Sequence, residues 1–356
     1  MFWNVLIFVI CTYLCGGLSK EIEVQTHLGK IRGITHKSRK GSDYYSFRGI
    51  RYAEPPVGAN RFLLPIPVKP WNGTLDATRN GFICPQGGVS HHLMSEDCLI
   101  LNVYTKDLNG SLPILFYIHG GYFTTGGSHS EIFWNPRYLM DKDIVVVTIN
   151  YRLGPLGFIN SGSEDSPGNL GLKDQVFALQ WVRDNIKYFG GDPNKVTISG
   201  NSAGGTSVTL HMVSPMSRGL FHGAIVSSGS GVSQFVSRNR NITKQLGEKY
   251  FCPTNDPKSL VQCLRTFFWS NLILSFSEEP TWMFDIEEDF GQEQFLSENP
   301  IGLYAQGKIA KVPVLVGITK DEYEPIVFAP MFTENDPENI MVEKMTTFWS
   351  TFVQTG

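Results

Sequence analysis

The sequence predicts an α/β fold in which helices cover both faces of a mainly parallel central sheet. Short apolar segments with the composition of strands recur at 112–118, 144–149, 196–199, 224–227 and 312–317. A helical pattern, with apolar residues three or four positions apart, separates the second of these segments from the third. Strands that alternate with helices form parallel sheets whose faces the helices cover.

The first residues have the pattern of a signal peptide. An apolar stretch begins at Phe2 and Trp3 and ends in the mostly small residues of 16–19, as secretory leaders do. It is short for a membrane-spanning helix, which needs about 20 apolar residues, although a signal anchor is the alternative. We therefore expect a signal peptide at 1–19, one domain at 20–356 and a secreted protein without a transmembrane span.

The rest of the chain divides into a β-rich start, a helical middle and an irregular later region. Residues 20–60 contain alternating apolar positions punctuated by glycine. The helix before residue 190 is marked by Val176, Leu179, Val182, Ile186 and Phe189, and glycines at 190 and 191 end it. Residues 230–300 are less regular and rich in aromatic side chains, which favours a cap of packed helices.

The strongest chemical motif is the sequence G-x-S-x-G at 200–204, with Ser202 at its centre. In this motif a strand turns sharply into a helix and carries an exposed nucleophilic serine at the turn. The β-branched run at 196–199 supplies the strand, and the glycines avoid a collision across the turn. We expect Ser202 to have a strained backbone and to face the N-terminus of the helix.

A second motif, His119-Gly120-Gly121-Tyr122-Phe123, follows the strand expected at 112–118. Glycines at the end of a strand let the backbone approach a bound carbonyl group. Their N–H groups can then stabilise the oxyanion of a tetrahedral intermediate. Together, the two motifs predict an acyl-transfer site.

Blocks of residues along nearly the whole chain resemble the type-B carboxylesterase and cholinesterase family. These blocks are 53–58, 61–62, 95–99, 101–104, 150–154, 168–169, 174–175, 178–182 and 189–193. The resemblance implies an α/β-hydrolase fold with a catalytic triad in the chain order Ser, Glu, His. It also implies that residues 230–300 line a gorge and an acyl pocket.

The resemblance assigns roles to individual residues. The segment 317–322 is similar to the family's acid segment, so Glu322 is the expected triad acid and Ser202 the nucleophile. The implied oxyanion donors are the N–H groups of Gly121, Tyr122 and Ala203. Tyr122 stands where the family commonly has glycine or alanine. Asn201 replaces a glutamate, which argues against cationic substrates.

The triad histidine is absent from the sequence. The last histidine is His222, whereas the family places its base about a hundred residues after the acid. Residues 327–332 resemble the stretch that follows the family's histidine, and 349–356 resemble its C-terminal block. We therefore expect an internal deletion with its junction near 323–326, which removes the base and at least one late strand, together with a truncated C-terminus.

No other histidine is expected to replace the missing base. His119 lies inside the oxyanion motif and is predicted to be structural. His211 and His222 lie on or after the helix that follows Ser202, where packed or surface roles are usual. The remaining histidines have no motif around them or fall in a loop: His27, His36, His91, His92 and His129.

Cysteines and sequons support a secretory protein. Outside the leader four cysteines remain, and counting alone allows three pairings. The family resemblance selects Cys84 with Cys98 and Cys252 with Cys263. Glycosylation sequons begin at Asn72, Asn109 and Asn241.

Composition restricts the class of partner. The formal net charge is −3, which gives no reason to expect nucleic-acid binding. No metal site and no cofactor are predicted, and the oligomeric state is not indicated.

The resemblance implies two structural ion pairs, Arg61 with Glu96 and Arg152 with Asp174.

We therefore expect a secreted serine carboxylic-ester hydrolase that acts on small ester substrates through an acyl-enzyme. As written, the chain is expected to be inactive or to have trace activity. The alternative is a catalytically silent, cholinesterase-like binding or adhesion module, although such proteins generally lose the nucleophile. A cholinesterase is disfavoured because the loop between Cys84 and Cys98 has no tryptophan for a choline site.

Overall fold

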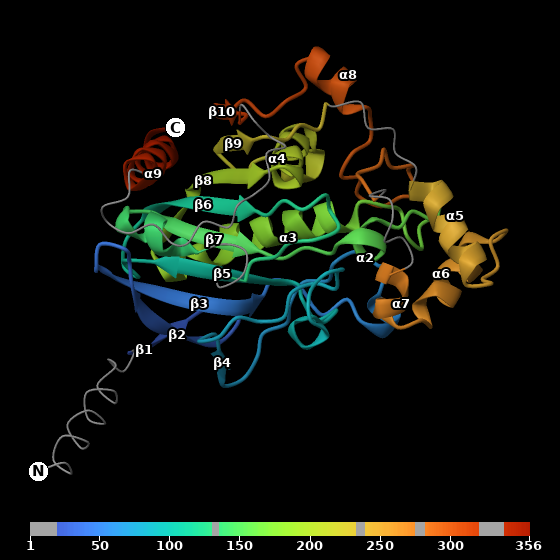
Figure 1. Ribbon diagram of the computed structural model, residues 1–356, viewed down its shortest axis with the longest axis horizontal. Coiled ribbons are helices and arrows are strands. Elements are labelled where there is room, and N and C mark those ends of the chain that lie inside the picture. The colour runs from blue at the N-terminus through green and yellow to red at the C-terminus, as the bar shows by residue number, and fades with distance from the viewer. Residues whose placement is uncertain (1–19, 130–134, 233–238, 275–281, 320–337) are drawn as a thin grey trace, which may run out of the picture.

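The computed structural model describes residues 20–129, 135–232, 239–274, 282–319 and 338–356, with side chains in the last range from residue 343. The described strands form one mixed, ten-stranded sheet (Figure 1). Its order is β1 (Glu21–Gln25), β2 (Lys30–Lys37), β3 (Asp43–Arg51), β5 (Ile100–Thr105), β7 (Val145–Ile149), β6 (Leu112–Ile118), β8 (Gly191–Asn201), β9 (Gly223–Ser227) and β10 (Val314–Gly317), and β4 (Thr74–Asp76) pairs with β2.

The sheet changes from antiparallel to parallel along this order. Strands from β1 to β7 pair antiparallel. From β7 through β6, β8 and β9 to β10 every pair is parallel. Parallel strands all end at the same edge of a sheet, so the loops that follow β6, β8, β9 and β10 lie close together. The expected α/β fold with a mainly parallel sheet is confirmed.

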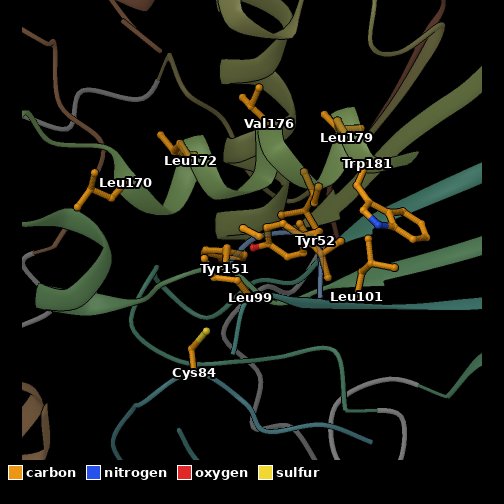
Figure 2. Packing of buried hydrophobic residues seen from close by; sticks show 14 of the residues in the cluster. Tyr52, Cys84, Leu99, Leu101, Tyr151, Leu170, Leu172, Val176, Leu179 and Trp181 are labelled. Carbon is orange, nitrogen blue, oxygen red and sulfur yellow. The ribbon is translucent and has the colours of Figure 1, made fainter. Parts of the chain in front are cut away.

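Helices cover both faces of the sheet. The core on one face contains side chains of α3 (Leu170–Asn185) and α4 (Ala203–Val213). Figure 2 shows α3 residues Leu172, Val176 and Leu179 in the same buried cluster as Tyr52 and Leu101. On the other face a smaller cluster includes Val353 of α9 (Glu338–Thr355) and Leu139 of the 3₁₀ helix η3 (Pro136–Asp141).

The later region forms the predicted cap of helices at one end of the sheet (Figure 1). Its members are α5 (Asn239–Lys249), α6 (Pro257–Arg265) and α7 (Trp269–Leu274), and α7 packs against α2 (Gly154–Phe158). A short helix, α8 (Pro300–Ala305), follows. The remaining 3₁₀ turns are η1 (Gly58–Asn60), η2 (His91–Leu93), η4 (Ile186–Phe189) and η5 (Pro215–Ser217).

Most predicted elements are present with shifted ends. The helix expected before residue 190 is α3 extended by η4, and Gly190 ends it at a φ of 74°. The strand expected at 196–199 is longer, because β8 begins at Gly191 and continues to Asn201. The strand β5 was not predicted, because all six of its residues are buried and no alternation marks it.

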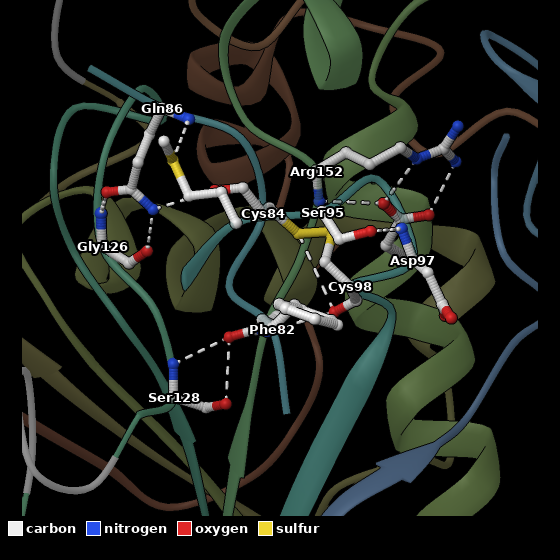
Figure 3. Close-up of a disulfide and its surroundings, with 12 residues drawn as sticks. Phe82, Cys84, Gln86, Ser95, Asp97, Cys98, Gly126, Ser128 and Arg152 are labelled. Atoms are coloured by element: carbon white, nitrogen blue, oxygen red, sulfur yellow. Dashed lines mark hydrogen bonds and ion pairs between the residues drawn. A yellow bond between two sulfur atoms is a disulfide. The ribbon is translucent and has the colours of Figure 1, made fainter. Parts of the chain in front are cut away.

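The two disulfides implied by the family resemblance are present. Cys84 is bonded to Cys98 (Figure 3). Cys252 is bonded to Cys263. The first closes the loop that contains η2, and the second ties the end of α5 to α6. Among the described helices, none is long and apolar enough to cross a membrane.

Candidate active site

Ser202 occupies a sharp turn between β8 and α4. Its backbone has φ 55° and ψ −122°, a combination that non-glycine residues rarely adopt. The Ser202 N–H donates to the Ser227 carbonyl of β9 at 2.9 Å, and its own carbonyl accepts from the Thr206 N–H at 2.8 Å. The half-buried serine is therefore fixed at the carboxyl end of the parallel strands, as expected for a nucleophile elbow.

The glycines beside Ser202 are required by close backbone packing. A Cβ atom on Gly200 would lie 2.3 Å from the Gly204 carbonyl carbon. One on Gly204 would lie 2.1 Å from the carbonyl oxygen of Ile118, the last residue of β6. Gly200 thus lets the end of β8 approach the first turn of α4, and Gly204 lets that turn approach the end of β6.

The glycine motif after β6 lies directly beside the serine. A Cβ atom on Gly120 would be 3.2 Å from the Ser202 Cβ atom and 2.6 Å from the Asn201 carbonyl oxygen. Gly121 and Tyr122 have φ values of 109° and 55°. Ala203 is the first residue of α4, so its N–H belongs to the helix N-terminus. The structure thus places Gly120 and Ala203 beside Ser202, and Gly121 and Tyr122 follow Gly120 directly in the chain.

The glycine motif is held by contacts on both sides. The Gly121 carbonyl accepts from the N–H groups of Thr124 and Thr125, each at 2.9 Å. Gln86 donates to the Gly126 carbonyl and accepts from its N–H, both at 2.7 Å (Figure 3). Sequence reasoning missed Gln86, and only its position two residues after Cys84 could have drawn attention to it.

Glu322, the expected triad acid, lies outside the described residues. The strand before it, β10, pairs with β9, with Gly317 opposite Ser227. Ser227 also lies opposite Asn201, the residue before the nucleophile. The chain therefore leaves β10 at the edge of the sheet that carries Ser202.

All eight histidines of the sequence are described, and no described residue forms a hydrogen bond with the Ser202 hydroxyl. His119 is buried and stacks on Tyr151 with ring centroids 4.3 Å apart, while its Nδ1 lies 2.8 Å from the Gly120 carbonyl oxygen. Burial lowers the pKa of His119 to about 4. These contacts support the predicted structural role.

Two histidines that follow the serine in sequence lie away from it. His211 is near the end of α4, about 12 Å along the helix axis, and its ring nitrogens lie 2.7 Å from Ser217 Oγ and 2.9 Å from Gln175 Oε1. Burial lowers its pKa to about 3. The His222 N–H donates to the Val196 carbonyl, and the Val196 N–H donates to His222 Nδ1. Val196 precedes Asn201 by five residues of β8, a distance of about 17 Å along the strand.

The other five histidines belong to different parts of the molecule. His36 is in β2, five strand spacings or about 24 Å from β8. His27 lies before β2 near Tyr188. His92 bonds to Ser90, and the neighbouring His91 ring lies 5.0 Å from Trp269. His129 follows Ser128, which donates to Asn150.

The two expected ion pairs are present and buried. Arg61 contacts both Glu96 oxygens at 2.6 Å, and Arg61 also donates to the carbonyl groups of Arg265 and Phe267 in the cap. Arg152 contacts Asp174 Oδ1 at 2.7 Å and Oδ2 at 2.8 Å. Both pairs hold loops, as predicted.

A third buried ion pair was missed. Lys173 Nζ lies 2.6 Å from Glu287 Oε2, and both side chains are fully buried. Burial lowers the pKa of Lys173, and the charge of Glu287 opposes this effect. Lys173 was not recognised because a lysine on α3, beside an apolar stripe, has the pattern of a solvated face.

The remaining predicted positions are at the surface or lack a ligand cluster. The asparagines of the three sequons are exposed: Asn72, Asn109 and Asn241. Among the described residues, no group of three or more His, Cys, Asp or Glu side chains could hold a metal ion.

A serine at a strained strand–helix turn, next to a glycine loop at the carboxyl ends of parallel strands, defines an α/β-hydrolase. A sequence model of the carboxylesterase family matches residues 20–333. The chain therefore belongs to the carboxylesterase family.

Similar proteins have esterase names. Esterase FE4 of Myzus persicae is 41% identical over 341 residues, which cover 90% of this chain and 58% of that protein. Juvenile hormone esterase of Tribolium castaneum is 40% identical over 84% of this chain and 54% of that protein. The crystal structure of juvenile hormone esterase from Manduca sexta, with OTFP covalently attached, matches with a TM-score of 0.78 and 34% identity, covering 83% of this chain and 59% of that one. The chain thus spans somewhat more than half the length of these relatives.

Proposed function

We propose that the chain carries the acyl-transfer site of a serine carboxylic-ester hydrolase for small, uncharged esters. The observation that carries the proposal is the strained Ser202 backbone, placed beside the Gly120–Tyr122 backbone and the start of α4. Ser202 Oγ attacks the ester carbonyl carbon, and the electrons of the carbonyl double bond move to its oxygen. The N–H groups of Gly121, Tyr122 and Ala203 stabilise that oxyanion.

In this mechanism Glu322 is the triad acid, and the base that should stand between it and Ser202 is missing from the 356 residues. Without the base the serine hydroxyl is a weak nucleophile. Removing the histidine of a Ser-His-Asp site typically reduces turnover about a million-fold. The proposed activity of this chain is therefore trace ester hydrolysis, for which the deletion near 323–326 is the proposed cause.

We also propose that residues 1–19 are a signal peptide and that the domain at 20–356 is secreted and glycosylated. Two disulfides and three exposed sequon asparagines support this proposal, because disulfides persist in oxidising compartments.

A silent binding module is the second candidate, and the positions of the eight histidines favour it. The two candidates differ in whether Ser202 can be acylated. The chain is incubated with p-nitrophenyl acetate at pH 8 and at pH 10, and acetylated serines are located by peptide mass spectrometry. We expect slow, selective acetylation of Ser202 that is faster at the higher pH, where hydroxide can act as the base.

The controls separate the possible outcomes. A Ser202→Ala variant should lose the selective acetyl group and keep only background labelling. Acetylation that is no faster at Ser202 than at exposed serines would exclude the acyl-transfer site and leave the binding module. A rapid burst followed by turnover would contradict the expected trace activity.

A further inference from the structure

Four buried polar side chains form a continuous chain of hydrogen bonds that leads to the elbow. They are Gln175 of α3, Ser207 and His211 of α4, and Ser217 of η5, and each is at most 1% exposed. The chain continues to the backbone of Ala203, the first residue of α4. Burying polar groups costs stability unless they are paired, and here the four side chains serve as partners for one another.

The chemistry of the side chains determines the direction of each bond. Gln175 Oε1 can only accept, so His211 Nε2, which lies 2.9 Å from it, carries a proton. Burial lowers the pKa of His211 to about 3, so the ring is neutral, and its Nδ1 accepts from the Ser217 hydroxyl at 2.7 Å. The Gln175 amide donates to Ser207 Oγ at 3.2 Å, and the Ser207 hydroxyl donates to the Ala203 carbonyl at 3.0 Å. All four bonds therefore run in one direction, from Ser217 to Ala203.

The chain ends on the residue that follows the nucleophile, and two peptide groups flank that residue. The first joins Ser202 to Ala203 and carries the N–H proposed as an oxyanion donor. Its carbonyl oxygen, on Ser202, accepts from the Thr206 N–H at 2.8 Å. The second peptide group carries the Ala203 carbonyl, which accepts from the Ser207 hydroxyl. The hydrogen-bond chain therefore holds the first turn of α4 from the protein core.

We propose that Gln175, Ser207 and His211 are positioning residues for Ser202, because the chain they form holds the first turn of α4 in the geometry that acyl transfer requires. The inference rests on the proposed function of Ser202. Oxyanion donors are effective because they are in place before the charge develops, and a small displacement removes much of their effect. The three side chains are buried and act only through the backbone of α4.

A double-mutant cycle tests the connection. The rate of Ser202 acetylation by p-nitrophenyl acetate at pH 10 is measured for Ser207→Ala, for Gln175→Met and for the double variant. Each single change should slow acetylation about tenfold, as expected for a displaced donor. The double variant should be no slower than Ser207→Ala, because Gln175 acts on the turn through Ser207. If the two effects multiply, the residues act independently and the proposal is overturned.

Thr209→Ala is the matched control on the same helix. The Thr209 hydroxyl donates to the Thr206 carbonyl at 2.7 Å, so it also bonds back to the backbone of α4. Thr209 is not part of the chain that ends at Ala203, and its replacement should leave the rate of Ser202 acetylation unchanged. If this variant is as slow as Ser207→Ala, the loss of any such bond on α4 is sufficient, and the assigned role is wrong.

Nitrogen NMR of the parent protein tests the direction of the chain without any reaction. With ¹⁵N-labelled histidine, the His211 signals are identified by their absence from a His211→Gln variant. We expect a neutral ring at pH 7 with its proton on Nε2. A proton on Nδ1 instead would reverse the bond to Gln175, so that the chain no longer ends as a donor to Ala203, and would overturn the proposal.

Failure of this inference is distinguishable from failure of the proposed function. If the parent protein is selectively acetylated at Ser202 and neither Ser207→Ala nor Gln175→Met slows the reaction, only the positioning role is refuted. If Ser202 of the parent protein is not selectively acetylated at pH 10, the proposed function and the positioning role are both refuted, whatever the tautomer of His211.

Discussion

Two residues of the site have a backbone conformation that residues with a side chain rarely adopt. Tyr122 and Ser202 both have φ 55°, in the region that glycine adopts without strain. At Ser202 the turn presents the hydroxyl group. At position 122, where the family commonly has glycine or alanine, this chain has a tyrosine whose aromatic side chain is 60% exposed. Phe123 is buried next to it and fixes the loop, so the strain at Tyr122 is held by packing.

The strain at Tyr122 gives a prediction about stability. We expect Tyr122→Gly to have a free energy of unfolding about 1 kcal/mol higher than Tyr122→Ala, because only the glycine relaxes the left-handed conformation. Both variants remove the same exposed ring, so the comparison isolates the backbone contribution. Urea denaturation followed by tryptophan fluorescence measures it. Equal stabilities would mean that position 122 is not strained.

At the scale of elements, α3 is the helix that organises the loops around the site. It is buried nearly all round, including its polar residues Lys173 and Asp174. Buried charges must be paired, and these two connect α3 to Glu287, which lies between α7 and α8, and to Arg152, which follows β7. The helix thus holds both the segment between α7 and α8 and the loop that follows β7.

This arrangement predicts a large effect from one buried pair and a small effect from an exposed pair on the same helix. Arg152→Met should lower the free energy of unfolding by about 3–5 kcal/mol, because it leaves Asp174 buried without its partner. Arg183→Met removes the pair with Asp184, whose side chains are 53% and 50% exposed, and should change stability by less than about 1 kcal/mol. Denaturation of both variants beside the parent protein measures the difference, and similar losses would contradict this account.

At the scale of the whole molecule, the described sheet ends at β10 with an open apolar edge. Val316 and Ile318 are 67% and 82% exposed. Phe348 of α9, which lines the same surface hollow as these two residues, is also exposed. Unpaired strand edges with apolar side chains promote association between chains.

We therefore expect Val316→Lys to reduce concentration-dependent association, because a charged side chain on an edge strand disfavours pairing. Static light scattering over a dilution series measures the weight-average mass. Val57→Lys serves as the control, because it introduces the same charge at an exposed residue that is not part of β10 and lies just before η1. If the parent protein is monomeric at all concentrations, the edge does not mediate association.

Sequence reasoning located most of the site because local patterns determine it. The run at 196–204 specifies a strand, a tight turn and a helix start, whatever surrounds them. The glycine motif after β6 is recognisable for the same reason, since glycine is required where backbones approach closely. The resemblance to known esterases then supplied the ion pairs and disulfides, which local patterns alone left undetermined.

The sequence by itself determined the fold class, the nucleophile elbow, the glycine motif and the absence of a late histidine. Only the tertiary structure decided which residues meet across long separations. It revealed Gln86 against Gly126, Lys173 against Glu287 and the fully buried strand β5. It also placed all eight histidines away from hydrogen-bonding contact with Ser202. The physical reason is that buried polar pairs and uniformly buried strands leave no local periodicity, because their partners come from distant parts of the chain.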